Sequence, residues 1–473
     1  MAMARGWKVL MVTSVAVYLV SLDVTVVNIA FPTILEEFEG TSRTFLSWSL
    51  SGYNIGFAAA LLTAGRLADR FGRKRIFLIG LTGFSVASML CGIAPTPGTL
   101  IAARVLQALA GALVMPSSLA LVLPEFPPNR RSAAIGVWGA VGGIAAATGP
   151  SLGSVLVENI SWRAVFFINV PLCIATWIFG RPILQESRDE NARGMPDVLG
   201  SFLGIGAVGM LTLAIVQGDD WGYDDSRVIA ALVLAAALLP LFLLRCHRRT
   251  DPILDLGLLK ERYFTVANLA AFLFSLGFFA MLFTNVQYLV GVWQYSTLGA
   301  GLAMTPGPLF AAMTSAPAGR LADRYGHRVV IVPGTAIFAI GMVLLVVGMG
   351  PEPQYWTRLF PASVFTGVGV GFTISTVGSA ANAFLPPARF AMGSAFNATV
   401  RQIGAALGFA TAVAILGTAD RVGPAAAFDR AWGMMAACSL SAGLLMLVAY
   451  RRPLAAPQPD VSAAPGIPAV AAD

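Results

Sequence analysis

The feature that most constrains this chain is the recurrence of long apolar stretches without charged residues along its 473 residues. A helix that crosses a bilayer needs about 20 predominantly apolar residues. Hydrophobic side chains make up 57% of the sequence and charged ones only 12%, which is more apolar surface than a soluble domain of this length buries. We therefore expect an all-α polytopic membrane protein.

The apolar stretches predict fourteen transmembrane helices. Their expected positions are near residues 7–30, 46–65, 76–94, 99–122, 133–157, 163–180, 198–217, 228–244, 263–285, 298–318, 329–348, 354–378, 391–416 and 431–449.

Lys and Arg concentrate in alternate loops. If the N-terminus is inside, 23 of the 31 basic residues fall on the cytoplasmic side, in agreement with the positive-inside rule. We expect both termini to be cytoplasmic. Arg outnumbers Lys 28 to 3, a bias typical of GC-rich bacterial genomes, so we expect a multi-pass protein of the bacterial inner (plasma) membrane. The Ala/Pro-rich residues 451–473 predict a disordered cytoplasmic tail.

Several chemistries lose support from the composition. The four cysteines show no paired or metal-ligand spacing, and the two histidines lie among arginines in polar stretches, so we expect no metal site and no enzyme. The net charge of +7 comes from small basic groups between apolar runs, which indicates membrane topology and not nucleic-acid binding. No nucleotide-binding GxxxxGK[ST] run is present. We expect no cofactor, with the proton gradient as the energy source.

An internal repeat divides the chain. Gly65-Arg66-Leu67-Ala68-Asp69-Arg70 recurs as Gly319-Arg320-Leu321-Ala322-Asp323-Arg324, at an offset of 254. The copies lie eight predicted helices apart, so two extra helices separate two six-helix halves. We predict two pseudo-symmetric six-helix bundles at 1–185 and 261–450, an inserted hairpin of spans 7 and 8 with its linkers at 186–260, and the tail at 451–473. Parallel halves of this kind are typical of secondary transporters.

Five motifs in order resemble the major facilitator superfamily, specifically its fourteen-helix drug:proton antiporter branch. They are Leu22 to Pro32, Gly65 to Arg75, Arg104-Val105-Leu106-Gln107, Gly149-Pro150-Ser151-Leu152-Gly153, and Trp162 to Pro171. The resemblance covers nearly the whole chain. It implies alternating access, proton coupling and export of small molecules.

Asp23 is the one acid predicted to lie well inside a span. It falls roughly 24 Å along a 30 Å core, and Arg104 in the antiparallel span 4 lies at a similar depth. An acid in this position is by default a proton or cation site. We expect Asp23 to take up and release the coupling proton, while Arg104 stabilises its charged form in one conformation and relaxes in another. The alternatives are a fixed structural ion pair, or an Asp that bonds only helix backbone groups.

The loop residues Gly65, Asp69, Arg70, Gly72 and Arg73 are expected to form a conformational gate, in which the carboxylate binds Arg and a helix N-terminus across the interface between the halves. The alternative is a tight turn with orienting charges. Asp323 and Arg324 form the second copy, with the same alternative.

Two further groups of residues are singled out. Gly149, Pro150 and Gly153 predict an antiporter-type bend in span 5 that seals the cavity against proton leak, or plain helix packing. Arg401, near the midplane, binds either a polar or anionic substrate group, or backbone carbonyls and Gln402. The other candidates for a substrate cavity, or for contacts between helices, are Asn28, Tyr53, Asn54, Gln107, Trp138, Asn285, Gln287 and Asn397.

Together these features predict a monomeric, proton-coupled antiporter that exports hydrophobic or amphipathic small molecules. Its expected partners are the small-molecule substrate, protons and the lipid bilayer. The alternatives within transport are a dedicated exporter of one endogenous metabolite or lipid and a proton-coupled importer. The alternative outside transport is a membrane-embedded enzyme or sensor.

Overall fold

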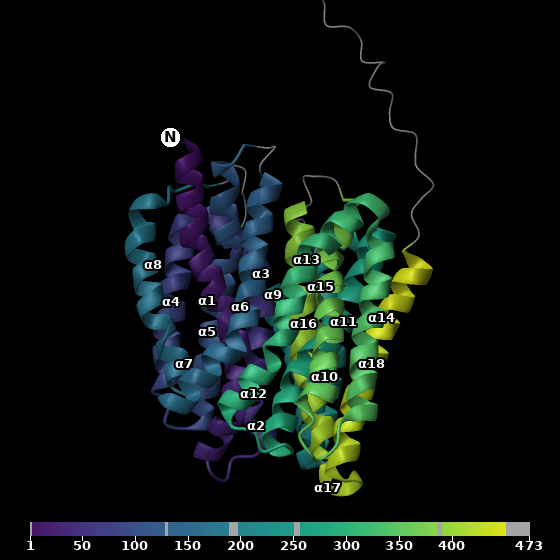
Figure 1. Ribbon diagram of the computed structural model, residues 1–473. Helices are drawn as coiled ribbons and strands as arrows, with labels where there is room; N and C mark the ends of the chain where they lie inside the picture. Colours follow the sequence, from purple (N-terminus) through teal and green to yellow (C-terminus); the bar gives the residue numbers. More distant parts are fainter. Residues whose placement is uncertain (1, 128–130, 189–196, 250–255, 386–389, 451–473) are drawn as a thin grey trace, which may run out of the picture.

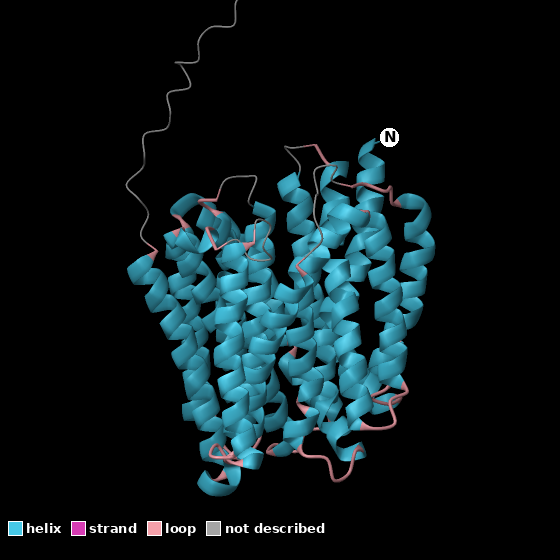
Figure 2. Cartoon of the chain, turned by 180° about the vertical axis from the view of Figure 1, so that it is seen from behind, coloured by secondary structure: helices cyan, strands magenta, loops and turns pink. Residues whose placement is uncertain are grey.

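The computed structural model describes residues 2–127, 131–188, 197–249, 256–385 and 390–450. These residues form helices and loops, and none of them belongs to a β-strand (Figure 2). The all-α prediction is confirmed for this part of the chain. The predicted tail at 451–473 and parts of the two predicted linkers lie outside the described residues.

The first half of the chain forms a bundle of long helices with short helical segments at its ends. The bounds are α1 (Ala2–Glu37), α2 (Arg43–Leu46), α3 (Trp48–Phe71), α4 (Arg73–Gly92), α5 (Pro97–Val122), η1 (Leu123–Glu125), α6 (Arg131–Asn159), α7 (Ala164–Phe167) and α8 (Asn169–Ile183).

A helical hairpin and a second bundle follow. Their bounds are α9 (Val198–Trp221), α10 (Ser226–Arg248), η3 (Leu258–Lys260), α11 (Arg262–Gly291), α12 (Thr297–Met304), α13 (Pro306–Tyr325), α14 (His327–Gly348), the π-helix η4 (Tyr355–Leu359), α15 (Phe360–Asn382), α16 (Phe390–Gly417), α17 (Ala419–Val422) and α18 (Pro424–Ala449).

Eleven helices of the described ranges are long and apolar enough to cross a membrane, and a twelfth span results if the bent pair Arg43–Ala58 and Thr63–Phe71 is counted as one. All fourteen predicted ranges overlap described helices. The protein is therefore a multi-pass membrane protein, while the count of fourteen stays a prediction. The last turn of α18 lies at the same end of the bundle as the start of α1 (Figure 1).

The two halves repeat one packing pattern. Helix α6 packs on α1 as α16 packs on α11, α5 contacts α3 and α4 as α15 contacts α13 and α14, and α8 packs on α4 as α18 packs on α14. Figure 1 shows the halves side by side, with the early helices on the left and the late ones on the right. This arrangement agrees with the repeat in the sequence.

The hairpin of α9 and α10 lies against both halves. Helix α9 contacts α3 and α16, whereas α10 packs on α9. At the start of α9, Asp197 caps the helix by accepting a hydrogen bond from the Gly200 amide and forms ion pairs with Arg245 (2.7 Å) and Arg249 (3.1 Å). Burial acts to raise the pKa of the Asp197 carboxyl, but the hydrogen bonds and charges of these groups outweigh it, and the pKa is lowered overall.

The start of α5 fixes the depth of a functional arginine. Thr96 and Thr99 form a reciprocal capping box, and Pro97 occupies the first turn, a position where its missing amide hydrogen costs nothing. Arg104 follows two turns later and is almost fully buried, with a relative exposure of 1%. Helix α1 is continuous from Ala2 to Glu37 and carries Asp23 in its middle third.

Candidate functional site: a buried charge cluster in the first bundle

Asp23 in α1 and Arg104 in α5 form an ion pair between the Asp23 Oδ2 and Arg104 Nη1 atoms. Both side chains are buried. The sequence indicated similar depths for Asp23 and Arg104, and in the structure the two side chains are in direct contact. The role of the pair in proton coupling stays a prediction.

Two amide side chains complete the coordination of the carboxylate. The Gln107 Nε2 group donates to Asp23 Oδ1 at 2.8 Å, and the Asn169 Nδ2 group donates to the same oxygen at 3.3 Å. Both amides also donate to the Ser88 hydroxyl oxygen in α4, at 2.7 and 3.3 Å. The charged carboxylate is therefore surrounded by hydrogen-bond donors from α5 and α8, which lowers the cost of holding it in an apolar bundle.

The guanidinium of Arg104 is held from three further sides. Its Nε donates to the Ser49 carbonyl at 3.1 Å, and its Nη1 donates to Gln107 Oε1 at 2.6 Å. The Tyr53 ring centroid lies 4.1 Å from the guanidinium carbon, close enough for a cation–π interaction. Arg104 is therefore a fixed positive charge beside a carboxylate, an arrangement that responds strongly to protonation of that carboxylate.

Asn169 and Ser88 are site residues that sequence reasoning missed. Asn169 lies within the Trp162 to Pro171 motif, and this position was the available signal. Its side chain is buried and its Oδ1 atom has no hydrogen-bond partner among the described residues. The sequence could not show that its side chain points at Asp23, because that depends on the rotation of α8 about its axis.

The first copy of the gate loop contains an ion pair and a glycine turn. Arg73 donates to Asp69 Oδ1 through Nε (3.0 Å) and Nη2 (2.9 Å). Gly72 has φ 108°, a conformation that favours glycine. Gly65 lies near Pro116 of α5, and the Arg70 guanidinium carbon lies 5.3 Å from the Phe71 ring centroid.

A carboxylate that the sequence did not single out occupies the N-terminus of α4. Glu186 accepts hydrogen bonds from the Lys74 and Arg75 amides, each at 3.1 Å, and an anion there is favoured by the helix dipole. A Cβ atom on Gly72 would lie 2.5 Å from the Glu186 carboxyl carbon. The loop is thus tied to the segment that follows α8, over more than 110 residues of chain.

The second copy of the loop is more open. Gly326 repeats the positive φ, at 94°, but Asp323 and Arg324 are exposed and no ion pair to Asp323 occurs within the described residues. The Arg324 guanidinium carbon lies 5.2 Å from the Tyr325 ring centroid. The two copies therefore share a turn geometry and differ in their contacts.

Gly149 and Gly153 lie where α6 crosses α1. A Cβ atom on Gly149 would overlap Thr25 Oγ1, and one on Gly153 would lie 2.9 Å from Val26 Cγ1. Pro150 lies inside α6, and its carbonyl faces Gly301 of α12 in the second bundle. These residues therefore set the close approach of helices, and the predicted sealing of a cavity stays a prediction.

The predicted cavity residues do not form one group. Several join neighbouring helices. The Trp138 indole donates to the Ser118 hydroxyl (3.0 Å), the Trp432 indole to Asn285 Oδ1 (3.0 Å), and the Asn397 amide to Asn268 Oδ1 (3.0 Å).

Asn28 and Asn54 donate to carbonyls of their own helices, and each has a buried Oδ1 atom without a partner among the described residues. The Nε2 atom of Gln287 in α11 is also buried without a hydrogen-bond partner among the described residues. Arg401 in α16 is partly exposed, and its side chain forms no hydrogen bond with another described residue. These four residues keep hydrogen-bonding capacity for a ligand.

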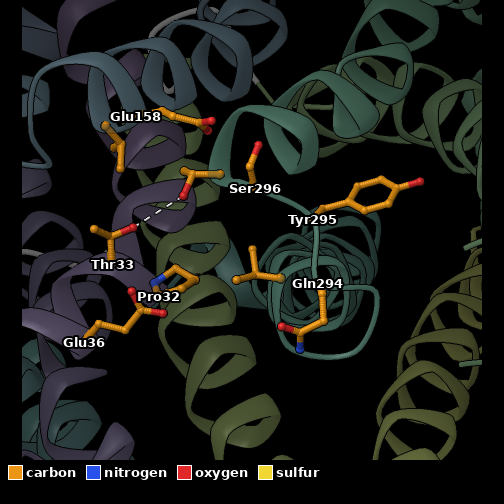
Figure 3. A pocket seen from close by; sticks show the side chains of 10 residues that line it. Pro32, Thr33, Glu36, Glu158, Gln294, Tyr295 and Ser296 are labelled. Atoms are coloured by element: carbon orange, nitrogen blue, oxygen red, sulfur yellow. Dashed lines mark hydrogen bonds between the residues drawn. The ribbon is translucent and has the colours of Figure 1, made fainter.

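A cavity of about 380 Å³ lies elsewhere, between the two halves at the end of the bundle opposite the N-terminus. Figure 3 shows Thr33 and Glu36 on one side and Gln294, Tyr295 and Ser296 on the other, and the Thr33 and Thr297 hydroxyls are 3.4 Å apart. None of the predicted site residues lines this cavity. No group of three potential metal ligands occurs in the described ranges.

The family model of the Major Facilitator Superfamily matches residues 13–284 and 267–471. A puromycin resistance protein of Streptomyces alboniger is 35% identical over 460 residues, which cover 94% of this chain and 90% of that protein.

Two further relatives have similar coverage. A tetracenomycin C resistance and export protein of Streptomyces glaucescens is 34% identical over 89% of this chain and 77% of its own length. A multidrug efflux pump of Mycolicibacterium smegmatis is 32% identical over 86% of this chain and 80% of its own length. With the family model matching nearly the whole chain, the protein belongs to the Major Facilitator Superfamily and is a transporter.

Proposed function

We propose that this transporter exports hydrophobic or amphipathic small molecules from the bacterial cytoplasm in exchange for protons. The observation that carries the proposal is the Asp23 carboxylate, buried in an apolar bundle, paired with Arg104 and hydrogen-bonded to two amides. An acid in this setting changes its interactions greatly when it gains a proton. Protonation of Asp23 releases Arg104, and this change couples the proton to the conformation of the first bundle.

The relatives support the direction of transport and the class of substrate. Their names describe resistance to puromycin, export of tetracenomycin C and efflux of multiple drugs. Two of these three names state transport out of the cell. Puromycin, an amphipathic molecule, is therefore the first substrate to test for this chain.

The architecture that fits this function has fourteen spans, with a six-helix bundle on each side of the α9–α10 hairpin and both termini in the cytoplasm. The repeated packing of α1–α8 and α11–α18 supports it. Contacts between α6 and α12 join the halves at the end opposite the N-terminus, where the Glu158 carboxylate accepts from the Leu298 amide at 2.6 Å. In alternating access these contacts break when that end opens.

Purified protein in proteoliposomes tests the proposal. Addition of puromycin, or of the dye ethidium, should release protons from the protein, and a pH gradient should drive accumulation of either compound. Asp23→Asn should abolish both effects, and an uncoupler should abolish accumulation by the wild type. Accumulation that persists in Asp23→Asn at the wild-type rate would contradict the proposal. A panel of unrelated dyes distinguishes a multidrug exporter from one dedicated to a single compound.

A further inference from the structure

The hydrogen bonds of Asp23 Oδ1 cannot stay as they are when this oxygen is protonated. In the charged state it accepts from both Gln107 Nε2 and Asn169 Nδ2. A protonated carboxyl oxygen carries a hydrogen and needs an acceptor for it. One of the two amides must therefore present its oxygen, because two N–H donors facing an O–H group leave the buried hydrogen unpaired.

To present its oxygen, an amide group must rotate so that its oxygen and nitrogen exchange places. Gln107 and Asn169 differ in the hydrogen bonds that this rotation breaks. Gln107 Oε1 accepts from Arg104 Nη1 at 2.6 Å and from the Cys91 thiol at 3.7 Å. A turn of Gln107 would break both bonds and point its NH2 group at the guanidinium. Asn169 Oδ1 is buried and accepts from no described residue. A turn of Asn169 breaks no bond on its oxygen side.

The Ser88 hydroxyl makes the turn of Asn169 possible. It accepts from Asn169 Nδ2 at 3.3 Å in the charged state. After the turn, the Asn169 oxygen faces Ser88, whose hydroxyl hydrogen can rotate to donate to it. Gln107 Nε2 keeps its bond to the remaining lone pair of Asp23 Oδ1.

We propose that Asn169 is the positioning residue of the proton site, with an amide that presents NH2 to the charged Asp23 carboxylate and turns its oxygen to accept from the protonated one. The inference rests on the proposed function of Asp23. The proton adds to Asp23 Oδ1, the carboxylate loses its charge, and the new O–H donates to Asn169 Oδ1. Release of the proton reverses the turn.

The other titratable groups facing Asp23 come from four helices. Arg104 in α5 is the charged one, and Tyr53 in α3, Cys91 in α4 and Cys173 in α8 also interact electrostatically with the carboxylate. Of these, Cys91 donates to Gln107 and Arg104 donates to Asp23 itself. None of them offers an oxygen acceptor that is bonded to Asp23 Oδ1.

Infrared spectroscopy of the purified protein without substrate tests the inference. The band of the protonated Asp23 carboxyl is identified by its absence in Asp23→Asn, and its pH midpoint is measured. In Asn169→Leu the charged carboxylate loses an N–H donor and the protonated carboxyl loses its acceptor. The bond to the charged form is the stronger one, so the midpoint should rise by about one pH unit. The infrared band of the protonated carboxyl should also move to a higher wavenumber, because its O–H group is no longer hydrogen-bonded. Asn169→Ser should restore both the midpoint and the band position, because a hydroxyl both donates and accepts. Asn169→Ala should behave as Asn169→Leu and replaces it if the larger side chain prevents folding.

A matched control and a second readout separate the outcomes. Asn159→Leu, at an exposed amide of α6 that bonds only its own helix, should leave the midpoint unchanged. The pH profile of ethidium export should shift with the infrared midpoint. An unchanged position of the carboxyl band in Asn169→Leu, or the same band position in Asn169→Leu and Asn169→Ser, would overturn the role of Asn169 alone. A wild type without any titrating band that Asp23→Asn removes would overturn the proposed function as well.

Discussion

Asp23 in α1 and Arg104 in α5 hold each other in a part of the first bundle that excludes solvent, with relative exposures of 2% and 1%. Such a pair costs desolvation energy, and replacement by apolar residues is often neutral for stability. Because stability of the fold does not require the Asp23–Arg104 pair, we attribute the pair to the proposed binding and release of a proton. Its strength also makes it sensitive to the loss of either partner.

Removal of Arg104 should destabilise the protein more than removal of Asp23. Arg104→Gln leaves the carboxylate charge buried without a cation and should cost about 3–5 kcal/mol. Asp23→Asn should cost less, because Arg104 keeps the Ser49 carbonyl, Gln107 Oε1 and the Tyr53 ring. The double variant should recover most of the loss from Arg104→Gln and still lack coupled transport. Thermal unfolding in detergent measures the loss of stability, and proton-driven efflux measures the loss of coupling. An Arg104→Gln protein as stable as wild type would contradict the predicted loss of stability.

Much of this site could be predicted from sequence, since charges are rare in these apolar stretches. Asp23 and Arg104 stand out on that ground, and counting residues from the helix ends gives their depths. The neutral members of the cluster could not be predicted in the same way. Asn169 and Ser88 belong to residue types common in membrane helices, and only the rotation of α8 and α4 places them against the carboxylate.

The contacts of the gate loop were beyond sequence reasoning for a different reason. The repeat and the motif from Gly65 to Arg75 identified Asp69, Gly72 and Arg73. The partner at the N-terminus of α4 is Glu186, a residue distant in sequence with no motif around it. The positions of helices could be predicted because apolar stretches of about 20 residues mark them, while the count of fourteen spans stays a prediction. Short segments such as α7 and α12 interrupt them at points set by tertiary packing.

Glu186 should stabilise the start of α4. Glu186→Gln removes the negative charge from the helix N-terminus and should cost about 0.3–1 kcal/mol, and Glu186→Ala should cost more because the amide hydrogen bonds are lost as well. Thermal unfolding at low and high salt measures the loss, which should shrink at high salt for Glu186→Gln. Glu39→Gln, at an exposed position that follows the C-terminal end of α1, is the matched control. Equal stability of Glu186→Ala and wild type would exclude the cap.

The glycine contact between α6 and α1 should be intolerant of a methyl group. Gly149→Ala places a carbon against Thr25 and should cost about 1–3 kcal/mol through overpacking. Gly408→Ala should cost at least as much, because its added carbon meets the Leu276 backbone oxygen of α11, which cannot rotate away. Gly433→Ala in α18 is the control, since nothing lies within 4 Å of the added carbon. If Gly149→Ala and Gly408→Ala melt at the same temperature as wild type, the helices do not pack as closely at these glycines as they do in the structure.

Asp197 should make the hairpin sensitive to acid. Its pKa is lowered in the folded protein, so its stabilising contribution is fully present above the unfolded value of about 3.9 and is lost as pH falls through the lower folded value. Asp197→Asn should be less stable than wild type at pH 7 by about 1–3 kcal/mol, because Arg245 and Arg249 lose the negative charge with which they pair. The difference between the two proteins should narrow below about pH 4. Melting temperatures between pH 3 and 7 test this, and a difference that is constant over the range would contradict it.

The contact between α6 and α12 should open during transport. The Ser151 and Thr305 hydroxyl oxygens are 2.6 Å apart, so cysteines at these positions are close enough to form a disulfide with little backbone movement. Oxidation of Ser151→Cys/Thr305→Cys should hold the halves together at this end and stop puromycin transport, and a reductant should restore it. Each single variant should transport normally under oxidising conditions. Full transport by the cross-linked double variant would mean that the halves do not separate here, and alternating access through this end would be excluded.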